Sequence, residues 1–118
     1  MNRIKAVNKL DLYIQRLIKK AQAEVSDPAF RQQLATIEEC YGREWGTAVH
    51  ICRMYLETGT EEELRDRAEQ YSEKAQAYRL VWYDEDWQEW RDGDQVEAGF
   101  YEALADICRT AYEEGKNE

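Results

Sequence analysis

The sequence predicts an all-α domain: an irregular bundle of about five helices without a β-sheet, formed by residues 1–118 as one acidic unit. Apolar residues recur every three or four positions through most of the chain, which is the spacing of one helix face. One proline and six glycines leave little material for long loops. Apolar residues make up 43% of the chain, which is enough for a core at this length.

Two helices are predicted in the first third of the chain. The first runs from Ile4 to Val25, and its inner stripe is Val7, Leu10, Ile14, Leu17 and Ala21. The second begins at residues 26–28, because a capping serine and aspartate precede a proline at the first helical position. It is expected to end at Tyr41 before the glycine Gly42. Its predicted inner face is Phe30, Leu34, Ile37 and Tyr41.

A third helix is predicted from Glu44 to Thr58, with Gly59 as its stop signal. Its inner stripe is Trp45, Val49, Cys52 and Leu56. Gly46 inside this helix costs about 1 kcal/mol relative to alanine. Gly46 either permits close approach of a neighbouring helix or places the true start nearer Thr47.

A fourth helix is expected to begin after Thr60, because Glu63 three positions later completes a capping box. Six residues spaced by three or four positions then share one face: Leu64, Ala68, Tyr71, Ala75, Tyr78 and Trp82. The spacing therefore predicts that Trp82 lies in the core. An unbroken helix over residues 61–91 would be about 46 Å long at about 1.5 Å per residue, too long for a compact domain.

The apolar pattern changes direction after Trp82. The later apolar residues form a second stripe about 100° round the helix. They are Leu80, Tyr83, Trp87 and Trp90. One straight helix cannot send both stripes to the same core, so we expect it to bend or end near residues 83–86. Tyr83, Trp87 and Trp90 then form either a second core layer or an exposed anchor for a partner.

The last helix is predicted to start after a turn at residues 92–94. Asp94 is the expected N-cap, with Glu97 three positions on. The residues expected to face inward are Val96, Phe100, Leu104, Ile107 and Ala111. Gly115 should end the helix, and residues 116–118 should fray.

The charge distribution indicates the kind of partner. A net charge of −9 argues against a general binder of nucleic acid or anionic membrane and is compatible with a basic protein partner. Residues 1–20 are basic and residues 57–106 are strongly acidic. Either these charges offset each other within the fold, or they promote head-to-tail self-association. No signal peptide or transmembrane segment is apparent, and three cysteines suit a reducing cytoplasm.

Aromatic rings beside carboxylates are typical of protein interfaces, where the rings are buried and the charges steer association. The predicted contact residues are Tyr83, Glu85, Asp86, Trp87, Glu89 and Trp90. A row of carboxylates on the preceding helix is the second predicted contact region, here called the acidic strip: Glu62, Asp66, Glu69 and Glu73. The strip is either an ordinary solvated face or a negative surface that imitates a phosphate backbone.

No pattern of catalytic or metal-binding residues is found in the sequence. The candidate zinc ligands Cys40, His50, Cys52 and Cys108 lack zinc-site spacing, and no cofactor motif is present. Cys52 and Cys108 are expected in the core, with Cys40 more exposed. Paired acids at residues 62–66 and 102–106 lack the spacing of known carboxylate metal sites.

The sequence therefore favours a non-enzymatic module that binds a basic protein. Nucleic-acid-binding proteins are one class of such partners. Size, charge and helicity are comparable with phage-encoded inhibitors of host defence and with immunity proteins, an analogy of type only. Two alternatives remain open. One is a metal-dependent helical hydrolase that uses clustered carboxylates, and the other is a structural homo-oligomeric subunit.

Overall fold

The computed structural model describes residues 1–113 as six helices and one small β-hairpin. The elements are α1 (Arg3–Ala23), α2 (Pro28–Gln33), α3 (Ile37–Tyr41), α4 (Arg43–Thr58), α5 (Glu61–Arg79), β1 (Trp82–Asp84), β2 (Glu89–Arg91) and α6 (Gln95–Glu113). The fold is broadly all-α, as predicted. The prediction of no β-sheet was wrong, because β1 and β2 pair antiparallel.

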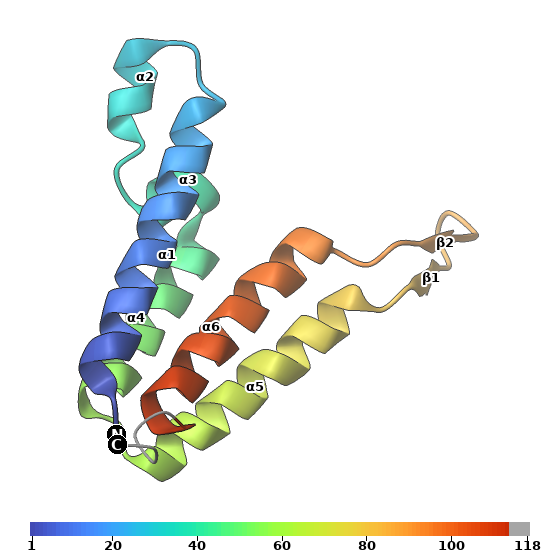
Figure 1. The fold of residues 1–118 in the computed structure, drawn as a ribbon. Coiled ribbons are helices and arrows are strands. Elements are labelled where there is room, and N and C mark those ends of the chain that lie inside the picture. The colour runs from blue at the N-terminus through green and yellow to red at the C-terminus, as the bar shows by residue number, and fades with distance from the viewer. Residues whose placement is uncertain (114–118) are drawn as a thin grey trace.

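The helices form two arms that diverge like a V (Figure 1). The first arm contains α1, α3 and α4, with α2 at its open end, and the second contains α5 and α6, with the hairpin at its open end. This shape gives extents of 50 × 41 × 19 Å and a radius of gyration of 16.4 Å. That radius exceeds the roughly 13–14 Å of a compact domain of this length, because the arms separate.

The predicted second helix is instead two short helices, α2 and α3. Thr36 explains the interruption, because its hydroxyl accepts a hydrogen bond from the Glu39 backbone N–H and so caps a new helix. α2 contains no buried residue, and Phe30 is exposed instead of facing inward. Leu34 and Ile37 are buried, as predicted.

The predicted inner stripe of α4 is confirmed. Trp45, Val49, Cys52 and Leu56 are all buried. Gly46 serves the close approach of α3: a Cβ added there would meet the Cβ of Glu38 at 2.9 Å.

Contacts between α6 and the first arm hold the two arms together. The Trp45 ring stacks on Phe100 of α6 with centroids 3.9 Å apart, and its indole N–H donates to Glu97 at 2.9 Å. Near the point of the V, the Lys9 ammonium donates to Thr110 at 3.1 Å. Tyr13 of α1 also stacks on Phe100.

The last helix begins as predicted, with the Asp94 carboxylate accepting from the Glu97 backbone N–H. Phe100, Leu104, Ile107 and Ala111 are buried, as expected. Val96 is exposed, which corrects that prediction, because it lies at the open end where the arms have separated. The predicted helix end at Gly115 and the fraying of residues 116–118 lie outside the described residues. Within residues 1–113, no helix has the length and apolar character needed to span a bilayer.

Candidate functional site

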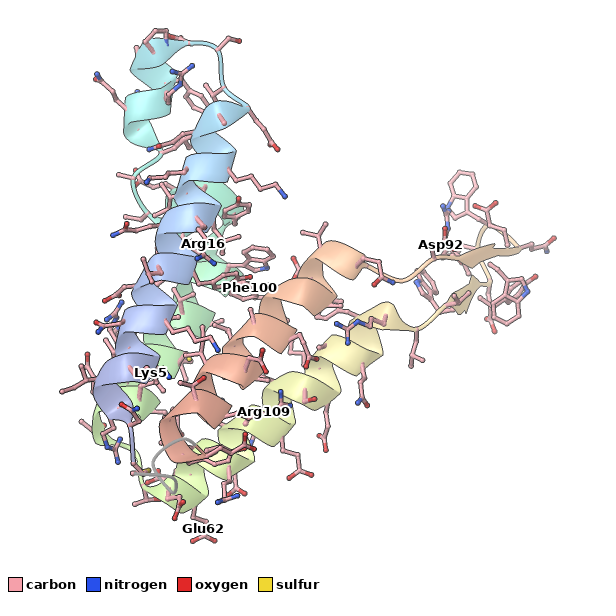
Figure 2. The ribbon with its side chains drawn as sticks, viewed as in Figure 1. Lys5, Arg16, Glu62, Asp92, Phe100 and Arg109 are labelled. Carbon is pink, nitrogen blue, oxygen red and sulfur yellow. The ribbon has the colours of Figure 1, made fainter. Side chains whose placement is uncertain are left out.

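The segment between α5 and α6 is the candidate site, here called the aromatic hairpin (residues 80–94). α5 ends at Arg79, and Leu80 adopts an extended conformation. The sequence predicted a break nearer residues 83–86, so the helix ends earlier than expected. The next residues are rich in β-branched and aromatic side chains, which favour a strand. Figure 2 shows the hairpin projecting from the helices, with Asp92 labelled at its base.

The strand register places aromatic rings on both faces of the hairpin. Trp82 pairs with Arg91, Tyr83 with Trp90, and Asp84 with Glu89. Side chains alternate between faces along a strand, so Tyr83 and Trp90 share one face. Their ring centroids are 5.3 Å apart and tilted by 59°. Trp82 lies on the opposite face.

These rings are exposed to solvent. The exposed fraction is 53% for Trp82, 47% for Tyr83, 73% for Trp87 and 70% for Trp90. The prediction that Trp82 belongs to the core was wrong, because the helix that would have carried it inward ends at Arg79. Tyr83, Trp87 and Trp90 do not form a second core layer.

Asp84 organises the loop that joins the two strands. One oxygen of its carboxylate accepts hydrogen bonds from the backbone N–H of Asp86 at 3.0 Å and of Trp87 at 3.3 Å. Its other oxygen accepts from Arg91 at 3.3 Å. Gln88 completes the turn in the left-handed region, with φ of 52°. The loop therefore presents Trp87 at the tip of the hairpin.

The base of the hairpin is anchored to the end of α5. The Asp94 backbone N–H donates to the Tyr78 carbonyl at 2.7 Å. A Cβ on Gly93 would lie 2.5 Å from the carbonyl carbon of Arg79, so only glycine allows this approach. The hairpin position is thus fixed at its base, although its aromatic rings are exposed.

The acidic strip runs along α5, and its first residue is remote from the hairpin. All four of its residues are exposed on α5, and Figure 2 shows Glu62 at the end of α5 that is remote from Asp92. α5 has 19 residues and is therefore about 28 Å long at about 1.5 Å per residue. The structure thus brings together the six predicted contact residues from Tyr83 to Trp90 but separates Glu62 from them.

The cysteines lie as their sequence positions suggested. Cys52 and Cys108 are buried, with their sulfur atoms 4.0 Å apart between α4 and α6, and Cys40 is partly exposed. The hydrogen bond with the Cys108 thiol, together with burial, raises the pKa of Cys52. Over residues 1–113, no three His, Cys, Asp or Glu side chains are positioned to hold a metal ion.

Comparisons with protein-family models, curated proteins and solved structures found no match to this chain.

Trp82 is the exposed aromatic residue of the hairpin that the helical pattern had assigned to the core. Its spacing from Tyr78 continued a helical stripe by coincidence. The run Val81-Trp82-Tyr83 and the later pair Glu89-Trp90, separated by an acidic loop, were the available signal for a hairpin.

Proposed function

We propose that this protein is a non-enzymatic binding module that docks the aromatic hairpin onto a basic surface of a partner protein. The observation that carries the proposal is the exposure of three indole rings on a hairpin that projects from the helices. Each aromatic ring buries about 150–250 Å² when it is covered, so these rings have a large unrealised hydrophobic contribution. Tryptophan and tyrosine are also the side chains most enriched among residues that dominate binding energy.

The weak internal support of the hairpin favours a role that a partner completes. An isolated two-stranded hairpin is only marginally stable in water, and packing against another surface is what normally stabilises one. Here the exposed rings occur on both strands and at the tip. A partner that covered one face would stabilise the strand pairing as well as bury the rings.

The charge of the hairpin indicates a basic partner. Six acidic side chains and one basic side chain occur in residues 80–94. Glu85, Asp86 and Glu89 are exposed around the tryptophans. Such charges increase the association rate with a surface of opposite sign and repel other acidic proteins. A nucleic-acid-binding protein offers such a basic surface, which makes an inhibitor or immunity-type role the specific form of the proposal.

The acidic strip on α5 is proposed as a secondary contact region. Its four carboxylates are exposed. Arg65 pairs at 3.4 Å with Glu61, which is not part of the strip. Arg67 offsets none of the strip through an ion pair within residues 1–113 and stacks on Tyr55 instead. The strip therefore retains its negative charge along the second arm.

The test is affinity capture from the native host, followed by binding measurements with the purified partner. Trp87→Ala with Trp90→Ala should weaken binding by about a hundredfold or more, as expected for two residues that dominate an interface. Phe30→Ala is the matched control, because Phe30 is an exposed aromatic residue at the open end of the other arm. Asp86→Lys with Glu89→Lys should reduce the association rate and its salt dependence. Unchanged affinity in the tryptophan variant would disprove the proposed site.

A second candidate function is a head-to-tail homo-oligomer. It is favoured by the opposite charges of the basic residues 1–20 and the acidic hairpin. Light scattering distinguishes it from the binding module: a concentration-dependent increase in mass, abolished by salt, would support self-association, and a monomer at all concentrations would exclude it.

A further inference from the structure

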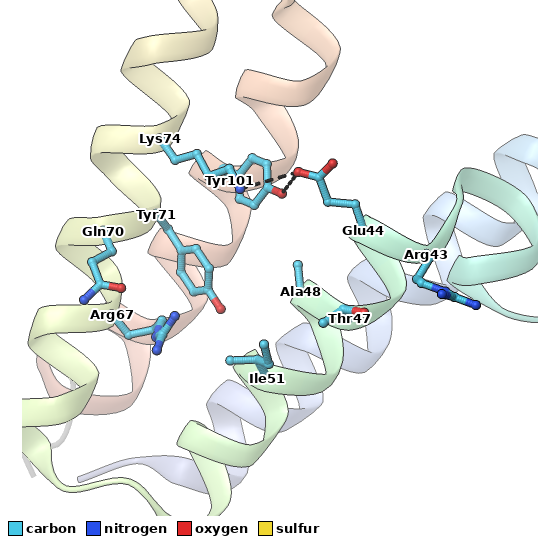
Figure 3. A pocket seen from close by; sticks show the side chains of 10 residues that line it. All are labelled: Arg43, Glu44, Thr47, Ala48, Ile51, Arg67, Gln70, Tyr71, Lys74 and Tyr101. Atoms are coloured by element: carbon cyan, nitrogen blue, oxygen red, sulfur yellow. Dashed lines mark hydrogen bonds and ion pairs between the residues drawn. The ribbon is translucent and has the colours of Figure 1, made fainter.

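The two arms enclose a cleft that is separate from the aromatic hairpin. Its volume is about 560 Å³, and it is lined by residues of α4, α5 and α6. In Figure 3, Ala48 and Ile51 of α4 lie across from Tyr71 and Arg67 of α5. Small-molecule sites generally have volumes of about 300–1,000 Å³ and apolar walls with a few polar groups. Ile51, Ala48 and the rings of Tyr71 and Tyr101 supply such walls here.

Tyr71 gives the cleft an unused hydrogen-bond donor. The side chain is only 5% exposed, and its hydroxyl is the one buried side-chain polar atom in residues 1–113 without a hydrogen-bond partner. In Figure 3 the hydroxyl points from α5 toward the α4 side of the cleft. Buried hydroxyls are normally paired, so an unpaired one that faces a cleft indicates a missing acceptor. Burial raises the pKa of Tyr71, which keeps the hydroxyl protonated and able to donate.

Arg67 gives the cleft a cation whose charge is not neutralised. Its guanidinium lies 4.4 Å from the ring centroid of Tyr55 and 5.8 Å from that of Tyr71. It forms no ion pair within the described part of the chain. Its flat guanidinium can bind a carboxylate through two parallel hydrogen bonds.

The acidic side chain at the cleft is already occupied. Glu44 pairs with Lys74 at 3.5 Å and accepts a hydrogen bond from Tyr101 at 3.1 Å. This cluster joins α4, α5 and α6 at one edge of the cleft, as the dashed lines in Figure 3 show. The charge that remains available at the cleft is therefore positive, in a protein whose net charge is −9.

We propose that this cleft binds a small carboxylate with a flat apolar body. The apolar body packs between Ile51 and the tyrosine rings, and the carboxylate accepts hydrogen bonds from the Arg67 guanidinium. A small shift of the cleft wall uncovers the Tyr71 hydroxyl, which then donates to the same carboxylate. This site is independent of the aromatic hairpin, which lies at the open end of the second arm.

The test is a titration of the full chain with 2-naphthoate, followed by amide chemical shifts. We expect saturable binding with shifts at residues that line the cleft. The neutral 2-naphthylmethanol and the cationic 2-naphthylmethylammonium should each bind at least about tenfold more weakly, because they lack the acceptor charge. Equal binding of 2-naphthoate and 2-naphthylmethanol, shifts located elsewhere, or no binding would each overturn the proposal.

Two variants test the roles of the polar groups. Tyr71→Phe removes only the hydroxyl, and Arg67→Met removes the charge while retaining an apolar stem. Each should weaken 2-naphthoate binding by about tenfold. Retained affinity in Tyr71→Phe overturns the proposal, and so does retained affinity in a folded Arg67→Met. Arg16→Met is the control of equal charge change, since Arg16 is exposed on α1 and does not line the cleft. A similar loss in Arg16→Met would show general charge attraction and overturn the site.

Thermal unfolding separates binding from folding effects. Tyr71→Phe removes a hydroxyl that has no partner in the fold, so its unfolding temperature should equal or exceed that of the parent chain. A clear decrease would show that the hydroxyl has a structural partner and would contradict its assignment as a ligand donor.

Discussion

Two groups of aromatic residues in this protein have opposite environments. In the aromatic core, Trp45 is 4% exposed and stacks nearly parallel on Phe100, and its indole N–H is paired with Glu97. In the aromatic hairpin, Tyr83 and Trp90 also contact each other, yet both remain exposed. The residue types are the same, so the difference lies in what surrounds them. Trp45 stacks on Tyr41 of the first arm and on Phe100 of the second, whereas the hairpin projects from the arms.

The two groups of aromatic rings contribute to different free energies. Burial of the Trp45 ring contributes to the stability of the single chain, because the ring leaves water when the arms meet. The hairpin rings make little such contribution in the isolated chain. If the proposed function is right, their burial contributes to the free energy of association instead.

The largest expected effect is the loss of Trp45. Trp45→Ala should lower the free energy of unfolding by about 3–5 kcal/mol, because it leaves a cavity between the arms and an unpaired Glu97. Trp90→Ala should change it by no more than about 0.5 kcal/mol, as for other exposed positions. Urea unfolding followed by circular dichroism measures both values. If both variants lowered the free energy of unfolding by similar amounts, the hairpin rings would contribute to folding as Trp45 does. The proposed difference between the two aromatic groups would then be wrong.

The helical stripes could be predicted because their periodicity directly reflects burial. Trp45, Val49, Cys52 and Leu56 follow a spacing that only one helix face satisfies, and all four are buried. Phe30 and Val96 fit equally good stripes but are exposed. Phe30 belongs to α2 and Val96 to the first turn of α6, which are at the open ends of the V. The pattern identifies a face, but the divergence of the arms decides whether that face is covered.

The hairpin could not be predicted from the same pattern, because a helix and a hairpin compete for one short segment. Trp82 fits the spacing of the preceding helix, and this continuity favoured a helical interpretation. The structure resolves the competition through one local contact and one packing contact: Asp84 accepts hydrogen bonds from the loop backbone, and Gly93 packs on the end of α5. Neither contact produces a periodic pattern in the sequence. Composition alone nevertheless singled out Glu85, Asp86 and Trp87, which the structure places in the exposed loop of the hairpin.

The junction between the two regions gives the second prediction. Gly93→Ala should lower the free energy of unfolding by about 1–3 kcal/mol, because the new Cβ would lie 2.5 Å from backbone atoms of Arg79. The same change at Gly99 is the matched control, since a Cβ there meets nothing within 4 Å. Gly99→Ala should stabilise α6 by up to about 1 kcal/mol.

The outcome also reports on how the hairpin is held. If the clash displaces the hairpin, amide shifts should change in residues 80–94 and at the end of α5, while those around Trp45 should remain. A Gly93→Ala variant as stable as the parent, with an unchanged spectrum, would show that the hairpin base is not fixed by this contact.

The smallest expected effect concerns pH and the edge of the aromatic core. Tyr13 stacks on Phe100 with ring centroids 6.4 Å apart, and burial, with a smaller contribution from Tyr41, raises the pKa of Tyr13 to about 12. Tyr13 loses its proton near pH 10 in the unfolded chain but only near pH 12 in the folded chain. Between these pH values, ionisation of Tyr13 therefore stabilises the unfolded chain. Stability should therefore be unaffected by Tyr13 below about pH 10 and should fall between about pH 10 and 12.

Because Tyr13 is only partly buried, the loss should be about 1 kcal/mol or less. The measurement is the difference in the free energy of unfolding between the parent and Tyr13→Phe across this range, since other groups also titrate there. Phenylalanine keeps the ring beside Phe100 and cannot ionise, so the variant should lose less stability than the parent as the pH rises. Parallel curves would mean that Tyr13 ionises equally readily in both states, and the aromatic core would then end at Phe100 without including Tyr13.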